Sequence, residues 1–129
     1  MIITVALHAQ GMRLAKWVFE SLVGLRQSGE TRRPSTLVVI AVVTVMLATH
    51  FLEIFVWSMC FFLTGLVPNP DAAMYFSVNS YTALGASGIV LEDRWRGIAG
   101  IETMVAMLMF GWSTAVLANV VQKLDSAID

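Results

Sequence analysis

The residues most able to do chemistry lie in a glycine-bearing stretch whose exposed backbone would line a path for an ion. Residues 75–91 read YFSVNSYTALGASGIVL and lie between two long apolar segments. Gly85 and Gly88 indicate a short helix that stops and gives way to exposed backbone. Such backbone is tolerated at membrane depth only where it is buried in protein or lines a water-filled cavity. The stretch therefore predicts a re-entrant helix and loop that line a pore.

Two ionisable side chains inside the first long apolar segment form the second candidate group. His50 and Glu53 are three residues apart, so a helix places them on neighbouring faces. Ionisable residues at that depth are rare and usually face protein or water. We interpret the pair as a buried structural hydrogen bond or ion pair, with a pH-sensing or ion-path role and metal binding as alternatives. A metal site would need further ligands, and His8 is the only other histidine.

The last apolar segment carries a further acid and a run of small residues. Glu102 is expected to hydrogen-bond near the re-entrant helix, to a group such as Tyr81 or Asn79. The sequence GWSTA, which begins at Gly111, brings small residues four apart and so permits close helix crossing or a bend. Gly111 and Ser113 are therefore candidates for a gating hinge, and packing alone is the alternative.

Composition indicates the class of protein that positions these residues. Hydrophobic residues make up 57% of the chain and charged residues 13%, against about a quarter charged in soluble domains. With a mean hydropathy of +0.75, the chain is expected to be a membrane protein. A formal net charge of −1 argues against a nucleic-acid partner. The single cysteine, Cys60, cannot form an intrachain disulfide and is interpreted as a small buried hydrophobe.

The N-terminal region, residues 1–34, is expected to form an amphipathic helix followed by a polar linker. Residues 1–27 are apolar nearly all round, broken by a narrow stripe of Arg13, Lys16, Glu20 and Gly24. We expect this helix to lie in the cytoplasmic membrane interface. The alternative is a poor extra span, which its charges make expensive.

A pore module is expected over residues 35–129. Its outer helix covers 35–67, more than the roughly 20 residues that a perpendicular span needs, and its inner helix covers 95–124. Arginines precede the outer helix and no basic residue directly follows it, which places both termini in the cytoplasm, at the cell inner (plasma) membrane. Trp95 and Lys123 would anchor the inner helix at the outer and inner interfaces.

A short re-entrant helix is expected between the two spans, at 71–84, with Asp71 as its cap. Its C-terminal end, the negative end of the helix dipole, would point at the filter-like loop 82–88 and favour a cation. The alternative is an extracellular interfacial helix that joins the two spans.

The order of span, re-entrant helix, glycine-bearing loop and span resembles the two-span pore module of bacterial potassium-channel-like proteins. The resemblance covers residues 35–124 and rests on SVNSYTALGASG, on Trp95 at the start of the inner helix and on FGWSTA from Phe110. The chain is also similar to a bacterial ion-channel family with an extra N-terminal helix that bears Leu-His-x-x-Gly, here at residues 7–11. The resemblance implies an all-α, tetrameric pore in which each subunit supplies one helix end and one set of carbonyls.

In that family, a threonine, a β-branched residue, a glycine, a tyrosine and a second glycine line the path with carbonyls that replace the hydration shell of the ion. On this chain the resemblance places Thr82 just before the filter. Ala83 then stands at the threonine position, Leu84 at the β-branched position and Gly85 at the first glycine. It thus implies that a monovalent cation binds at these four residues.

Beyond Gly85 the sequence departs from the family pattern. Ala86 replaces the tyrosine, Ser87 replaces the second glycine, and Gly88 falls where an aspartate usually follows. Together with the missing hydroxyl at Ala83, these changes remove the innermost site, the aromatic brace and a residue free to adopt a positive φ. Weak discrimination between K⁺ and Na⁺ is therefore expected.

The preferred function is a pore-forming subunit of a homotetrameric cation channel, in contact with membrane lipid, that conducts K⁺ and also Na⁺. The alternatives are a non-conducting membrane scaffold or regulatory subunit whose filter has decayed, and a membrane-embedded enzyme or small transporter. The sequence contains no nucleophile–base pattern and no phosphate-binding glycine loop. No enzymatic activity is therefore expected, and no cofactor besides the permeant ions.

Overall fold

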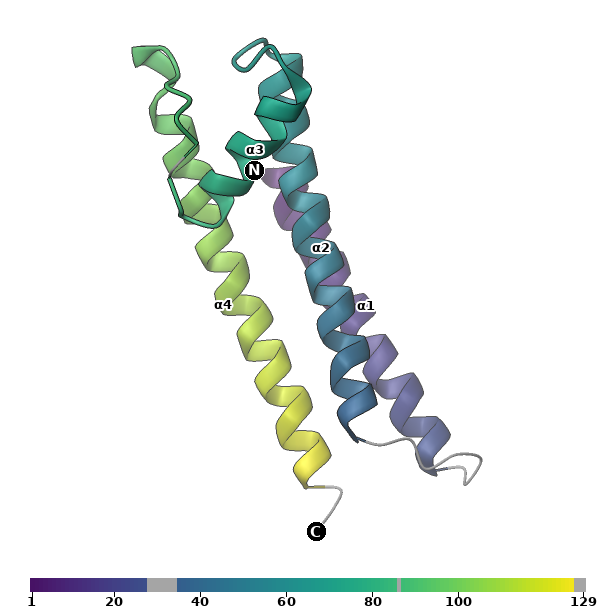
Figure 1. The fold of residues 1–129 in the computed structure, drawn as a ribbon. Coiled ribbons are helices and arrows are strands. Elements are labelled where there is room, and N and C mark those ends of the chain that lie inside the picture. The colour runs from purple at the N-terminus through teal and green to yellow at the C-terminus, as the bar shows by residue number, and fades with distance from the viewer. Residues whose placement is uncertain (28–34, 86, 127–129) are drawn as a thin grey trace.

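The computed structural model describes residues 1–27, 35–85 and 87–126, which are mostly helical (Figure 1). The described chain forms four α-helices and one short 3-10 helix: α1 (Ile2–Gln27), α2 (Ser35–Leu63), α3 (Pro70–Tyr81), η1 (Asp93–Trp95) and α4 (Gly97–Asp125). These residues contain no strand, so the predicted all-α class is confirmed.

Two segments of the described chain are long and apolar enough to cross a membrane. They are Thr36–Leu63, which belongs to α2, and Asp93–Asp125, which contains η1 and α4. The prediction of two such segments is confirmed. α2 ends at Leu63, before the predicted limit at 67, because Gly65 adopts a φ of 74° and its N–H turns back to the Phe62 carbonyl at 3.0 Å.

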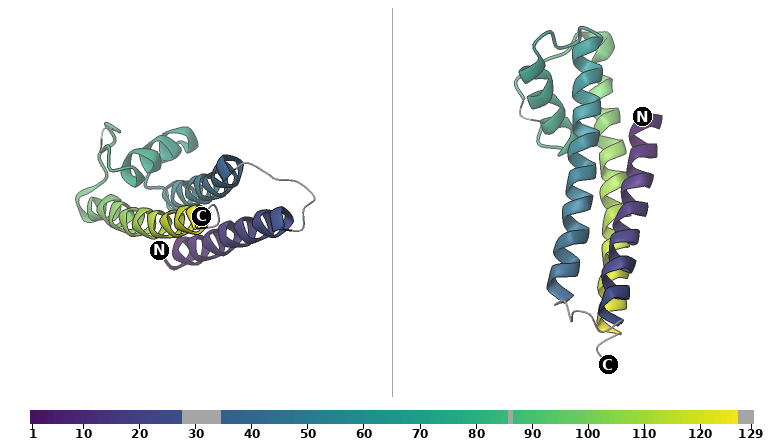
Figure 2. Two further views of the ribbon diagram at one scale, coloured as in Figure 1. Left: turned by 90° about the horizontal axis from the view of Figure 1, so that it is seen from below. Right: turned by 90° about the vertical axis from the view of Figure 1, so that its right-hand side faces the viewer.

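The N-terminal helix runs beside the two long helices. Figures 1 and 2 show α1 antiparallel to α2, and α1 also contacts α4. Met12, Ala15 and Phe19 face the bundle and are buried, whereas the charged stripe of Arg13, Lys16 and Glu20 is exposed. A helix lying flat in the membrane interface would cross the spans at a steep angle. α1 thus lies along the long helices, but it is not one of the two candidate spans, and its placement in the membrane stays a prediction.

The two ends of the described chain do not lie together. α1 starts at the level of α3, whereas α4 ends at the opposite end of the bundle, near the start of α2 (Figures 1 and 2). The expectation that both termini face the cytoplasm requires them to lie at the same end. The structure contains no membrane, so the sides that the two ends face stay a prediction.

The short helix α3 turns the chain back on itself. It starts beside the end of α2, runs back along the bundle, and the residues that follow return to the same end before α4 begins (Figure 1). Asn69 caps it, with its Oδ1 accepting from the Ala72 N–H at 3.0 Å. Asp71, the predicted cap, lies in the first turn instead. The reason is Pro70, which lacks an N–H and favours the first helical position, so the residue before it becomes the cap.

The end of α3 also differs from the prediction. The helix ends at Tyr81, with Thr82 as its C-cap, and not at residue 84. Ala83 adopts a left-handed φ of 60°, and a right-handed helix cannot continue through such a residue. The Gly85 N–H then returns to the Asn79 carbonyl at 3.2 Å. Residues 82–84 therefore belong to the loop.

Two apolar cores stabilise the bundle. The first joins α1, α2 and α4 and consists of Met12, Ala15, Phe19, Val38, Val42, Met46, Val116, Val120 and Leu124. The second joins α3 to α2 and α4 and is rich in aromatic rings. In it Phe61 meets Phe76 edge to face at a centroid distance of 5.0 Å and stacks on Trp57 at 6.0 Å. Burial of such rings contributes much of the energy that holds a short helix in place.

The outward faces of the long helices remain apolar. Leu47, Phe51 and Phe55 of α2 are exposed, as are Met104 and Leu108 of α4. Cys60 is exposed as well, which corrects the expectation that it is buried. A single chain leaves this surface uncovered, as expected if lipid or further copies of the chain cover it.

The contact between α1 and α2 depends on Gly11. A Cβ atom there would lie 2.2 Å from Thr49 Oγ1 and 2.9 Å from Thr49 Cβ, so any larger residue forces the helices apart. We expect Gly11→Ala to lower the free energy of unfolding in detergent by about 1–3 kcal/mol. Gly24→Ala is the matched control, because a Cβ there meets nothing within 4 Å. Equal effects of the two variants would contradict this packing.

Candidate functional site

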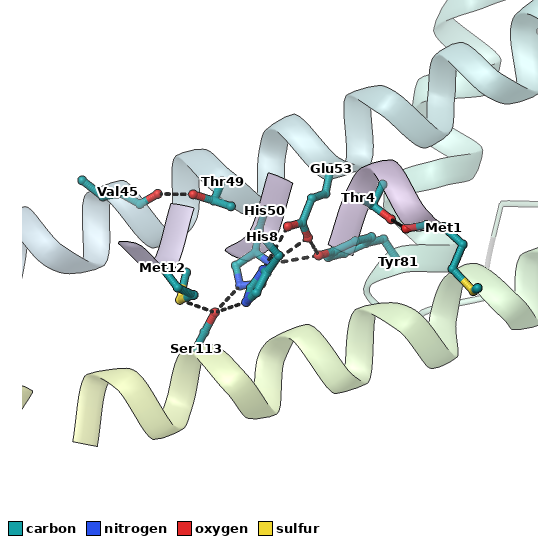
Figure 3. Close-up of polar contacts among 10 residues, drawn as sticks. All are labelled: Met1, Thr4, His8, Met12, Val45, Thr49, His50, Glu53, Tyr81 and Ser113. Carbon is teal, nitrogen blue, oxygen red and sulfur yellow. Dashed lines mark hydrogen bonds and ion pairs between the residues drawn. The ribbon is translucent and has the colours of Figure 1, made fainter. Parts of the chain in front are cut away.

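A polar cluster lies between the two apolar cores, where all four α-helices meet. Its members are His8 from α1, His50 and Glu53 from α2, Tyr81 from α3 and Ser113 from α4 (Figure 3). The exposed fractions of His8 and Glu53 are 0%, and that of Tyr81 is 1%. Burying ionisable groups among apolar side chains is costly unless they are paired. The contacts within the cluster are therefore required for the bundle to close.

Glu53 is the centre of the cluster. Its Oε1 lies 2.9 Å from His8 Nδ1, and its Oε2 lies 3.6 Å from His50 Nδ1. The Tyr81 hydroxyl donates a short hydrogen bond to Oε2. Burial and then this bond raise the pKa of the Tyr81 phenol above its usual range, so the phenol keeps its proton. Both carboxylate oxygens of Glu53 thus have partners.

Ser113 contacts the far side of both imidazole rings. Its Oγ lies 3.0 Å from His50 Nε2 and 3.4 Å from His8 Nε2. The same hydroxyl lies 3.8 Å from Met12 Sδ, a weak acceptor. His50 Nδ1, on the other side of its ring, lies 2.8 Å from the Tyr81 oxygen. The two Nε2 atoms therefore face α4, and the two Nδ1 atoms face Glu53 and Tyr81.

Helix geometry explains how these side chains converge. His50 and Glu53 lie three residues apart on α2 and share its inner side, as their spacing predicted. His8 reaches them from α1 because Gly11, one turn further along, lets the two backbones come close at Thr49. The Thr49 hydroxyl bonds back to its own helix at 2.9 Å and so leaves this contact free of unpaired polar groups (Figure 3).

Aromatic rings from α4 surround the histidines. The Phe110 ring lies 4.8 Å from the His50 ring and 5.4 Å, edge to face, from the Tyr81 ring. The Trp112 ring lies 5.3 Å from the His8 ring. These rings exclude water from the cluster, which strengthens the electrostatic attraction between its members.

A second buried carboxylate links α3 to α4. The Ser77 hydroxyl lies 2.6 Å from Glu102 Oε1 and 3.0 Å from the Ile54 carbonyl on α2. Glu102 does bond to the short helix, as predicted, but through Ser77 and not through Tyr81 or Asn79. The Asn79 amide instead donates to a carbonyl within α3 at 2.8 Å. Glu102 is fully buried, so this link fixes the depth of α3 against α4.

The loop that follows α3 is exposed. Thr82, Ala83, Leu84 and Gly85 are all exposed, and Ala86 lies outside the described residues. Among the hydrogen bonds of the described residues, none ends on a carbonyl oxygen of residues 82–85. These carbonyls are therefore available to an ion, to water or to another chain.

The loop residues with a positive φ differ from those that the resemblance implies. Positive φ values occur at Ala83 (60°), Gly85 (66°) and Gly88 (67°). Gly85 thus has the backbone freedom that the first filter glycine needs. Ser87, where a second positive φ was expected, has none, and Gly88 has one instead. Beyond Gly85, the positive φ among the described residues therefore lies at Gly88 and not at Ser87.

The two hinge candidates of α4 have different surroundings. Gly111 is exposed, and a Cβ atom there would meet nothing within 4 Å. Ser113 is buried in the polar cluster. α4 runs as one helix from Gly97 to Asp125 through both positions. Ser113 thus has a bonding role in this conformation, and Gly111 stays a hinge candidate.

No protein-family model, curated protein or solved structure matches the chain. The resemblance to potassium-channel-like pores therefore remains a prediction from the motifs of the sequence. The functional assignment depends on the chemistry of the polar cluster and of the loop.

Sequence reasoning found the pair on α2 but did not place its partners. Nothing in the spacing of His50 and Glu53 connects them to His8, Tyr81 or Ser113. One signal was available in Leu-His-x-x-Gly at residues 7–11, because a glycine one turn from a polar residue indicates a close helix contact at that level.

Removing the central carboxylate leaves two imidazoles and a phenol without their acceptor. We expect Glu53→Ala to lower the free energy of unfolding in detergent by about 3–5 kcal/mol, because each buried donor left without an acceptor costs about 1–3 kcal/mol. Glu20→Ala, on the exposed stripe of α1, should change it by less than about 0.5 kcal/mol. Similar losses for both variants would show that Glu53 is not the centre of the bundle.

Proposed function

We propose that the chain is the pore-forming subunit of a homotetrameric, potassium-channel-like cation channel of the cell inner (plasma) membrane. The observation that carries the proposal is the path of the chain after α2. α3 runs back along the bundle and ends at an exposed loop, and the chain then returns to the end from which α3 started (Figure 1). This is the course expected of a re-entrant pore helix and filter between two spans.

The loop carbonyls support a cation as the permeant ion. Residues 82–85 present carbonyl oxygens without hydrogen-bond partners in the described chain. They follow directly on the C-terminal end of α3, where the helix dipole is negative. Carbonyl oxygens and a negative dipole both stabilise a positive charge. Thr82, Ala83, Leu84 and Gly85 are the residues proposed to contact the ion.

Assembly around one axis follows from what a single chain lacks. One loop provides oxygens on one side of an ion only, so several copies are needed to replace its hydration shell. Cyclic symmetry supplies them, with each copy contributing the same loop and helix end. The exposed apolar faces of α2 and α4 offer surface for lipid and for neighbouring copies.

Weak selectivity is proposed from the same loop. Potassium preference depends on several stacked rings of carbonyls held at fixed spacing. The shift of positive φ from Ser87 to Gly88 interrupts the spacing beyond Gly85. Fewer regular rings discriminate less between K⁺ and Na⁺, so both ions are proposed to pass.

Assembly is tested by native mass measurement. The purified protein in a mild detergent is expected to have the mass of a homotetramer, because the loop carbonyls and the apolar faces need partner chains. A mass that corresponds only to monomer or dimer across several mild detergents would sink the proposed architecture.

Conduction is tested by planar-bilayer recording with K⁺ on one side and Na⁺ on the other. The wild-type reversal potential should lie between the values for perfect K⁺ and perfect Na⁺ selectivity. The combined variant Ala83→Thr, Ala86→Tyr and Ser87→Gly should move it toward the K⁺ value, because these residues restore the family pattern.

Two controls separate this channel from a contaminant. Gly85→Val places a β-branched residue at a φ of 66° and should abolish the current, whereas Gly24→Ala, in open space on α1, should not. A wild-type reversal potential that follows K⁺ alone would contradict the weak selectivity. Tetramers without current under any cation gradient would favour the non-conducting scaffold.

A further inference from the structure

We propose that His8, His50 and Glu53 bind a divalent transition-metal ion of the Zn²⁺ class, with the Tyr81 oxygen in the fourth position. The three side chains come from two helices, and their candidate ligand atoms all lie within 4.8 Å of one another. His8 and Glu53 are fully buried, and the His50 side chain is 11% exposed. The proposal does not depend on conduction, since the ion would sit inside the bundle of one chain.

The spacing of the donor atoms suits a tetrahedral ion. Zn²⁺ bonds of about 2.0–2.2 Å place neighbouring ligand atoms about 3.3–3.5 Å apart. His8 Nδ1 lies 2.9 Å from Glu53 Oε1, and His50 Nδ1 lies 3.6 Å from Glu53 Oε2. The Tyr81 oxygen lies 2.8 Å from His50 Nδ1. The candidate ligand atoms of His8, His50 and Glu53 all lie within 4.8 Å of one another, so the widest pair must close by up to about 1.5 Å for all three to bind one ion.

Without an ion, the cluster has too few protons on Ser113 to give every ring nitrogen a partner. If both rings are neutral and donate through Nδ1, each Nε2 needs a donor. Ser113 is the group that contacts both Nε2 atoms, at 3.0 and 3.4 Å, and its hydroxyl carries a single proton. One ring nitrogen then lacks a partner unless an imidazole takes up an extra proton. A metal ion offers another way to give every ring nitrogen a partner.

With a metal ion on both Nδ1 atoms, each ring carries its proton on Nε2. The Ser113 oxygen has two lone pairs and accepts from both rings, while its own proton points to Met12 Sδ at 3.8 Å. Ligating histidines generally donate the other ring N–H to such an outer partner. Every polar group of the cluster is then satisfied, and Ser113 acts as a positioning residue.

The charge and the position of the cluster are also compatible with an ion. Two neutral imidazoles and one carboxylate leave a net charge of +1 on a bound dication. Loss of the Tyr81 proton to the solvent would make the complex neutral, because a dication reverses the surroundings that hold that proton. A pocket of about 290 Å³ on the surface is lined in part by His50, Tyr81 and Thr82, so the cluster borders the surface on this side.

Zinc content of the purified full-length protein is the first test. The chain contains two histidines, both in this cluster, so purification must use a tag without histidine. After incubation with Zn²⁺ and gel filtration, we expect one bound Zn²⁺ per chain by elemental analysis. His8→Gln, His50→Gln and Glu53→Gln should each lose this stoichiometric zinc. Cys60→Ser removes an exposed thiol outside the cluster and should keep it.

The visible absorption of bound Co²⁺ provides a second measurement, which a change in folding alone does not produce. Wild-type protein loaded with Co²⁺ should show the intense visible absorption of a tetrahedral site, and each ion bound should release at least one proton. Tyr81→Phe should alter that spectrum by removing the fourth oxygen. Ser113→Ala should weaken Zn²⁺ binding about 10- to 100-fold, with Ser113→Thr restoring it.

Two sets of results would contradict the proposed metal site. Wild-type protein that retains no zinc, or zinc retained equally by His8→Gln, His50→Gln and Glu53→Gln, shows that the cluster is a hydrogen-bond network only. Folded Tyr81→Phe and Ser113→Ala proteins with unchanged Co²⁺ spectra and Zn²⁺ affinities contradict the roles of Tyr81 as fourth ligand and of Ser113 as positioning residue. Because these measurements record no current, they stand or fall separately from channel activity.

Discussion

The carboxylate of Glu53 is the group on which the rest of the bundle depends. An ionised acid among apolar helices is tolerated only with close, well-oriented partners, and no single helix can supply them. Glu53 obtains His8 from α1 and Tyr81 from α3, with His50 beside it on α2. Ser113 then orients both rings from α4. One charge thus sets the relative positions of all four α-helices, which the apolar cores on either side stabilise but do not by themselves align.

The loop after α3 presents the opposite situation, since its polar groups are left open. The carbonyls of residues 82–85 find no partner in the described chain, and the outward faces of α2 and α4 are apolar. Both features are unfavourable for an isolated monomer in water, and the proposed channel would resolve them with lipid, ions and further copies of the chain. The same reasoning connects the proposed pore to the proposed tetramer, because an ion bound by these carbonyls needs further oxygens from neighbouring loops to replace its hydration shell.

The sequence predicts the helices well and their mutual contacts poorly. The apolar runs predicted α2 and α4, since a helix of that length and hydropathy has few alternatives. The sequence predicts Asp71 as the cap of α3, but Pro70 takes the first helical position and makes Asn69 the cap. It predicts an end at residue 84, but the positive φ of Ala83 ends the helix at Tyr81. The approach of His8 to Glu53 links residues 45 positions apart. It depends on the direction in which α1 runs along the bundle, and the hydrophobic periodicity of a single helix does not predict that direction.

The two sites of this chain meet at one residue. Tyr81 is the last residue of α3, and Thr82, the first residue of the loop, follows it directly. The phenol of Tyr81 is held by Glu53 and His50, and the Ser80 carbonyl just before it accepts from the Thr103 hydroxyl of α4 at 2.6 Å. The start of the loop is therefore fixed in depth by polar contacts to both long helices. The proposed metal ion would bind the same phenol that anchors the start of the loop, so the buried site and the loop carbonyls are joined through Tyr81.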